Sequence, residues 1–149
     1  DGSAEITAVR LRGGDGAERY AFASGESVTI EIEASPARPL ADFVFGIGLF
    51  NTDGVCCYGT NTEIEGLEAE RLEGEGEALF TIERLDLIDG SYKIDVAIHR
   101  RDGYPYDYHR LLYSFRVRSA AKDVGIYRPR HTWRFSPEVR YKAAPTSEG

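Results

Sequence analysis

The sequence predicts a single all-β domain, built as a two-sheet, immunoglobulin-like β-sandwich. Three observations lead to this prediction. Alternation of polar and apolar residues with a period of two recurs along the chain, whereas helical spacing is hard to find. Turn residues separate the alternating segments roughly every 8 to 15 residues. The length of 149 residues suits one domain. A barrel is the alternative arrangement of such strands.

Seven main strands are expected, at residues 5–12, 27–33, 42–50, 55–60, 77–83, 91–100 and 111–118. The glycine-rich segment 13–16 ends the first strand as a flexible turn. In the second strand every other residue is apolar, as in a strand with one face in the core and one in water. Prolines at 36 and 39 end it.

The third and fourth strands form a predicted hairpin joined by an Asp-Gly turn. The third is apolar almost throughout, and Gly46 and Gly48 share one of its faces with Phe50. Two glycines on one face leave room for another group to approach the backbone closely.

An acidic, glycine-containing segment at 66–76 is expected to be a solvated loop before the strand at 77–83. The strand at 91–100 alternates most clearly, and its pattern points Asp95 and His99 away from the core. Residues 101–108 are predicted as an aromatic loop that leads into the last sandwich strand.

The sandwich is expected to occupy residues 1–119, and residues 120–149 a C-terminal strand and tail, with disorder from residue 142. Large apolar residues in a short tail need a place to be buried. The tail therefore adds a strand either to its own sheet or to a second copy of the chain, through Val124, Ile126, Tyr127, Trp133 and Phe135.

Composition excludes several classes of function. The net charge of −7 argues against binding nucleic acid or an anionic lipid surface. No apolar run approaches the roughly 18 residues of a membrane span. The only cysteines, Cys56 and Cys57, are adjacent, so we expect free thiols, which favour a reducing, cytoplasmic location. The absence of methionine indicates a segment of a longer protein.

The sequence shows no catalytic motif, and we predict no cofactor, no metal and no catalytic residue. It contains neither a phosphate-binding glycine loop with its Lys-Ser/Thr nor a nucleophile elbow. His99, His109 and His131 lack the spacing of a metal site. Glu63 and Glu65 are the kind of carboxylate pair a glycosidase uses, but solvated surface charge is the preferred interpretation.

The segment 43–62, an apolar glycine-containing strand, an Asp-Gly turn and a strand that closes on Gly-Thr-Asn-Thr, resembles the Wzt-type C-terminal carbohydrate-binding domain. This domain is attached to the ATP-binding subunit of bacterial polysaccharide (O-antigen) ABC transporters. Shorter segments at 4–6, 24–28, 87–92 and 113–117 are also similar to that family.

The resemblance implies a non-catalytic sandwich that binds an exported glycan, part of a lipopolysaccharide, and couples its completion to export. It implies a location at the cytoplasmic face of the inner membrane and an ATPase domain before residue 1. The implied partners are the polysaccharide, the transporter membrane subunit and a second copy of the chain. The second copy would bind by exchange of a C-terminal strand, for which residues 124–135 are the candidate.

Sugar recognition requires aromatic faces for the rings and planar polar groups for the hydroxyls. The residues that offer both, on the hairpin, the clearest strand and the aromatic loop, are Tyr58, Asp95, His99, Arg101, Tyr104, Tyr106, Tyr108 and His109. Three structural alternatives stay open: the tyrosines cap the core, the face of His99 is an ordinary solvated one, and Asn61 serves a turn. For the whole domain, the alternatives are a structural or adhesive immunoglobulin-like domain without a sugar ligand and a glycan-active enzyme.

Overall fold

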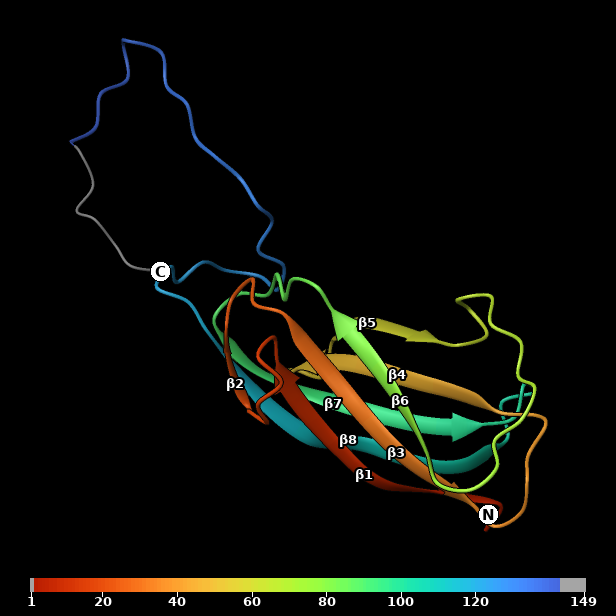
Figure 1. Ribbon diagram of the computed structural model, residues 1–149. Helices are drawn as coiled ribbons and strands as arrows, with labels where there is room; N and C mark the ends of the chain where they lie inside the picture. Colours follow the sequence, from red (N-terminus) through yellow and green to blue (C-terminus); the bar gives the residue numbers. More distant parts are fainter. Residues whose placement is uncertain (1, 143–149) are drawn as a thin grey trace.

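Eight strands form two sheets that pack face to face in the computed structural model, which describes residues 2–142 (Figure 1). The smaller sheet has the order β1-β3-β6 and the larger has the order β2-β8-β7-β4-β5. The strands are β1 (Ala4–Gly13), β2 (Ala21–Ala23), β3 (Val28–Pro36), β4 (Val44–Asn51), β5 (Cys56–Asn61), β6 (Gly76–Ile82), β7 (Gly90–His99) and β8 (Pro105–Arg118). The predicted all-β sandwich is confirmed.

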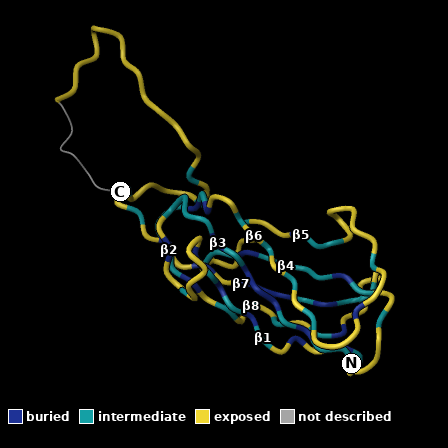
Figure 2. The backbone as a smooth tube through the Cα atoms, in the orientation of Figure 1, coloured by how far each residue is buried: buried dark blue, intermediate teal, exposed yellow. Residues whose placement is uncertain are grey.

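The core lies between the two sheets and consists of the inward-facing residues of the alternating strands (Figure 2). Ile30 and Ile32 of β3 meet Ile94, Val96 and Ile98 of β7, and each of these side chains is at most 1% exposed. Burying an apolar side chain of this size stabilises the fold by about 1.5–3 kcal/mol relative to leaving it exposed. The alternation on β7 also places Asp95 and His99 on the outer face of the larger sheet.

Two sequence-based expectations about strands were wrong. The segment at 21–23 forms β2, which was not predicted because three residues are too few to show a period; it pairs in parallel with residues 116–118 of β8. Residues 105–108, expected in an aromatic loop, belong to β8. Register shifts opposite Ile94/Val96 and Ile98/His99 interrupt the alternation of β8 and conceal the strand in the sequence.

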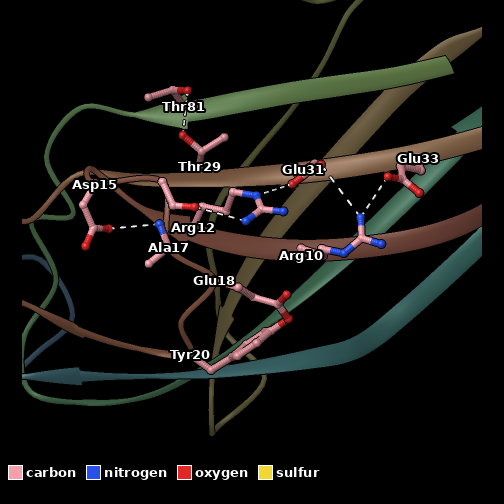
Figure 3. A network of polar contacts seen from close by, with 11 residues as sticks. Arg10, Arg12, Asp15, Ala17, Glu18, Tyr20, Thr29, Glu31, Glu33 and Thr81 are labelled. Atoms are coloured by element: carbon pink, nitrogen blue, oxygen red, sulfur yellow. Dashed lines mark hydrogen bonds and ion pairs between the residues drawn. The ribbon is translucent and has the colours of Figure 1, made fainter.

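Ion pairs between β1 and β3 lie on the outer face of the smaller sheet (Figure 3). Arg12 Nε lies 2.5 Å from Glu31 Oε2, and Arg10 Nη1 lies 2.9 Å from Glu33 Oε1. Glu77 brings a third carboxylate within 4.8 Å of the oxygens of Glu31 and Glu33. Because two guanidinium groups already bind Glu31 and Glu33, these two carboxylates are part of a charge network that holds β1 against β3.

The described chain beyond β8 is attached to the sandwich at two places. The Ser119 amide and Lys122 Nζ donate to Asp89 Oδ2 at 2.8 and 2.9 Å. The amide of Ile88 donates to the carbonyl of Ile126, and the amide of Arg128 donates to the carbonyl of Asp86, both at 2.9 Å. Residues 129–142 run away from the sheets as an exposed loop (Figures 1 and 2). Within residues 2–142, no helix is long and apolar enough to cross a bilayer. The expected disorder near the C-terminus concerns residues 143–149, which lie outside the described range.

Candidate functional site

A groove of about 450 Å³ crosses the outer face of the five-stranded sheet. The strand register explains its position. Gly46 of β4 lies opposite Ala97 of β7, which lies opposite Tyr108 of β8. Asn61 of β5 extends this row on the other side of Gly46. Because directly opposed residues of neighbouring strands point to the same face, the four residues line one surface.

The floor of the groove is made of residues with little or no side chain. Gly46 and Gly48 of β4, Gly59 of β5 and Ala97 of β7 all line it. A β-carbon added to Gly48 would lie 2.9 Å from Phe50 Cε1 and 3.2 Å from Asp95 Oδ1. At Gly46 the nearest atom would be 3.6 Å away. Gly48 therefore makes room for the Asp95 carboxyl group, whereas a β-carbon at Gly46 would make only ordinary van der Waals contacts.

The polar centre of the groove is the pair Asp95 and Tyr108. The Tyr108 hydroxyl donates a hydrogen bond of 2.7 Å to Asp95 Oδ2. That hydrogen bond, together with partial burial of the ring, raises the pKa of Tyr108 above its usual value. Asp95 is only 8% exposed, and its Oδ1 receives no hydrogen bond from any residue between 2 and 142. A nearly buried carboxylate oxygen without a protein donor is an unusual feature of a folded domain.

His99, Phe50 and Asn61 complete the wall of the groove. His99 Nδ1 lies 2.6 Å from the carbonyl oxygen of Arg100, which leaves Nε2 as the ring nitrogen that can bind another group. Phe50 offers an aromatic face beside the glycines. Asn61 Oδ1 accepts a hydrogen bond of 2.8 Å from the Ile64 amide. Its oxygen serves the turn, which agrees with the structural alternative considered from the sequence.

Three of the eight predicted sugar-binding residues come together here: Asp95, His99 and Tyr108. Tyr58 lies on the opposite side of the larger sheet, because it pairs with Leu49, whose side chain is buried in the core. It borders a separate apolar trough between β5 and β6. Residues that point to opposite faces of a sheet cannot contact the same ligand.

Tyr106 and His109 are turned away from the groove by the irregular course of β8. Tyr106 is 7% exposed, and its hydroxyl donates to the carbonyl of Asp42 at 2.8 Å. His109 stacks on Tyr113, with Nδ1 2.6 Å from the Tyr113 hydroxyl. In a strand with extra residues, the alternation of faces no longer follows sequence number. Tyr106 therefore caps the core, as the structural alternative proposed.

Arg101 and Tyr104 lie on the turn between β7 and β8, whose Gly103 borders the groove. The Arg101 amide donates to Asp42 Oδ1 at 2.9 Å. Tyr104 stacks against the Arg100 guanidinium at 4.8 Å from the ring centroid. Asp102 holds this turn: hydrogen bonds from the Arg100 side chain and the Tyr104 amide lower its pKa to about 2. The turn is a rim of the groove rather than its lining.

Sequence reasoning did not include Phe50, Gly46 and Gly48 among the binding residues, although it predicted that the two glycines leave one face of their strand open. The available signal was their shared face with Phe50. The sequence does not reveal that this face lies next to Asp95. That position depends on the pairing of β4 with β7, in which Gly48 lies opposite Asp95, 47 residues later in the chain.

Comparison with known proteins gives one family. The sequence model of the Wzt C-terminal domain matches residues 1–129. A curated relative, the O-antigen export system ATP-binding protein RfbB of Myxococcus xanthus, is 27% identical over 143 residues, covering 96% of this chain and 32% of that protein. The chain thus spans about a third of the length of this relative.

Solved structures agree on the fold. The crystal structure of the C-terminal domain of wzt has a TM-score of 0.78 at 19% identity, covering 91% of this chain and 86% of that chain. The alkylpurine DNA glycosylase AlkC of Pseudomonas fluorescens, bound to DNA containing an abasic site analog, has a TM-score of 0.52 at 12% identity, covering 78% of this chain and 31% of that chain. Both likenesses concern the fold alone.

Proposed function

The chain belongs to the Wzt C-terminal domain family, and from this premise we propose that it is a non-catalytic module that binds a bacterial surface polysaccharide of the O-antigen type in the groove of its five-stranded sheet. The observation that carries the proposal is the combination of a glycine floor with Asp95 and Tyr108 at its centre. An open floor admits a pyranose ring close to the backbone. A carboxylate and aromatic rings at its edge supply the two kinds of contact that sugars make.

The groove favours binding over hydrolysis. Retaining and inverting glycosidases both need two carboxyl groups that flank the scissile bond. Among the described residues that line the groove, Asp95 is the one carboxylate. Glu63 lies on the rim, 3.6 Å from the Arg101 guanidinium, and Glu65 binds the Thr60 hydroxyl at 3.2 Å. Both are held by other groups of the protein.

The test is a titration of the chain with O-polysaccharides freed from lipid A, followed by amide NMR shifts and calorimetry. We expect saturable shifts that centre on Gly46, Gly48 and Ala97. Tyr108→Ala should weaken binding at least tenfold, since it removes a stacking face and a hydrogen bond. Tyr20→Ala, an exposed tyrosine outside the groove, is the matched control. A structural domain without a sugar ligand would show no saturable shift with any polysaccharide.

For the whole protein we propose the role that the M. xanthus relative's name describes, O-antigen export. The ATP-binding region would then precede residue 1 and act with a membrane subunit at the cytoplasmic face of the inner membrane. The groove would report that a glycan of the right kind is present before transport. Deleting residues 1–149 from the full protein should abolish export while leaving ATP hydrolysis, and loss of hydrolysis as well would contradict a recognition role.

We also propose that the domain forms a homodimer through its C-terminal segment. Residues Trp133 and Phe135 are 77% and 50% exposed and stack on each other at 5.9 Å, away from the sandwich. An apolar trough of about 450 Å³ between the free edge strands β5 and β6, lined by Phe80, Ile82 and Leu49, is of the kind that an extended apolar segment fills. The partner's tail is the proposed occupant.

Double substitution of Trp133 and Phe135 by alanine tests the dimer. Each ring buries roughly 150–250 Å² in such a contact, so the dimer dissociation constant should rise at least a hundredfold. Sedimentation equilibrium measures this rise. Leu112→Ala, an exposed apolar residue on β8, is the control. A wild-type chain that sediments as a monomer at high micromolar concentration would contradict the proposal.

A further inference from the structure

A second cavity, of about 460 Å³, lies at the end of β8, whereas the glycan groove lies at its beginning. Four arginines from three separate segments of the chain line it: Arg84, Arg118, Arg128 and Arg130. His131 and the hydroxyl residues Ser24 and Ser119 complete the polar lining, and Asp86 is its one carboxylate within the described residues. Four guanidinium groups around one cavity are unexpected in a chain whose net charge is −7.

The positive charge of this cavity is only partly neutralised by the protein. Arg84 Nη2 lies 3.5 Å from Asp86 Oδ1, and Arg128 binds the carboxylate of Asp123. Within residues 2–142, neither Arg118 nor Arg130 forms an ion pair. Like charges gathered in a concave site repel one another and attract a counterion.

Backbone contacts hold the cavity in shape. The amide of Arg128 donates to the carbonyl of Asp86 at 2.9 Å, so the segment that carries the last two arginines is fastened to the sandwich. Gly25 has φ +86°, and a β-carbon there would lie 3.0 Å from Arg84 Nη2. The turn therefore passes close to the guanidinium without a side chain between them.

We propose that this cavity binds a phosphate or diphosphate group. The guanidinium group has a planar fork of N–H donors that matches phosphate oxygens bidentately, and it remains charged at all relevant pH values. A concave site of this volume accepts a small phosphorylated ligand rather than a phosphate polymer such as nucleic acid. The shared chemistry fits a saccharide phosphate, a free diphosphate and a phospholipid headgroup. The site is independent of the glycan groove.

Calorimetry with the full chain tests the site, with inorganic pyrophosphate and glucose 1-phosphate as probes. Arg118→Gln and Arg130→Gln should each raise the dissociation constant at least tenfold, because each removes a charged hydrogen bond. Arg118→Lys should fall between these variants and the wild type. Arg71→Gln removes the same charge from an exposed arginine 2.8 Å from Glu73 and should change nothing. Asp95→Asn, in the other groove, should also leave the affinity unchanged.

A sedimentation assay with phosphatidylcholine vesicles, with and without phosphatidylglycerol, separates the sources of the phosphate. Cosedimentation that requires phosphatidylglycerol and Arg118 would assign the site to a lipid headgroup, and binding of the soluble probes alone would assign it to a free or sugar-linked phosphate. Either result supports the site. Failure of all probes to bind, or an equal loss in Arg71→Gln, would overturn it. Arg130 lies outside the packed core, so we expect Arg130→Gln to stay folded. It therefore tests the site even if Arg118→Gln unfolds the domain.

Discussion

Replacing Tyr108 by phenylalanine isolates one hydrogen bond at the centre of the groove. The substitution keeps the ring and removes the hydroxyl that donates to Asp95 at 2.7 Å. A hydrogen bond to a charged group contributes about 1.5–3 kcal/mol. Tyr108 is 51% exposed, so water replaces part of the lost donor, and the lower end of this range applies. We expect a loss of about 1.5 kcal/mol, which lowers the melting temperature by about 3–6 °C for a chain of this size.

Urea denaturation at pH 7, followed by circular dichroism, measures this loss. Tyr104→Phe is the matched control, because Tyr104 is a half-exposed tyrosine on the adjoining turn that stacks on Arg100 through its ring. A cycle with Asp95→Ala and the double variant should give a coupling energy of about 1 kcal/mol. The double variant should be more stable than the sum of the single losses predicts, since removing both partners leaves no buried group unpaired.

A Tyr108→Phe variant within about 0.3 kcal/mol of the wild type, together with zero coupling, would refute the reasoning. It would mean that water satisfies Asp95 as well as the tyrosine does. In that case the carboxyl group is not held in a fixed position, and its role as the central contact of the groove would lose its basis.

Three further predictions follow from the same surface and from the titrating groups. Gly46→Ala should keep or raise stability, by up to about 1 kcal/mol, because the nearest atom to the added carbon is 3.6 Å away. The same methyl group should weaken glycan binding, and melting curves paired with calorimetry separate the two effects. Burial raises the pKa of Tyr106 and Tyr113 above 10.0, so the stability they provide is complete below about pH 10 and is lost as the pH rises through their folded pKa. Urea denaturation should show a free energy of unfolding that falls as the pH rises above about 10, and a flat profile in that range would contradict the prediction. Carbon NMR should give Asp102 a pKa of about 2 that returns toward 3.8 in Arg100→Gln, whereas an unchanged value would mean that Arg100 does not cause the shift.

Local periodicity was enough to predict the fold and half of the groove. On β7 the period of two places Ile94, Val96 and Ile98 inside and Asp95 and His99 outside, and the structure agrees. The same rule identified the open glycine face of β4. These predictions succeed because the strands concerned are regular over the residues that matter, so that sequence number alone fixes the face.

The errors about Tyr106 and His109 occur where a strand is irregular. Tyr106 and Tyr108 are two residues apart, yet one is buried in the core and the other lines the groove, because the pairing of β7 with β8 shifts between Ile98 and His99. Extra residues such as those in β8 depend on tertiary packing, and the sequence of a single strand does not reveal them. Tyr58 is an error of another kind, because its pairing with Leu49 is regular and the ordinary alternation of β5 places it on the inner side of its sheet.

The arginine cavity was beyond sequence reasoning for a different reason. Arg84, Arg118 and Arg128 lie in separate segments of the sequence, and a net charge of −7 does not predict an anion-binding site. The hydrogen bond between the Arg128 amide and the Asp86 carbonyl brings them together. The net charge of a chain therefore does not predict the local charge of one cavity.

The groove of the five-stranded sheet concentrates features that weaken a sandwich without a ligand. Gly46 and Gly48 interrupt an otherwise apolar strand with residues that lose the most entropy on folding. Asp95 is nearly buried with one oxygen lacking a donor, which is unfavourable by about 1–3 kcal/mol. On the outer face of the other sheet, by contrast, the nearly buried Glu31 is paired with Arg12. Domains are stable by only about 5–15 kcal/mol, so three such defects on one face are hard to explain by folding alone. They are explained if a ligand fills the space above the glycines and contacts the pair Asp95 and Tyr108.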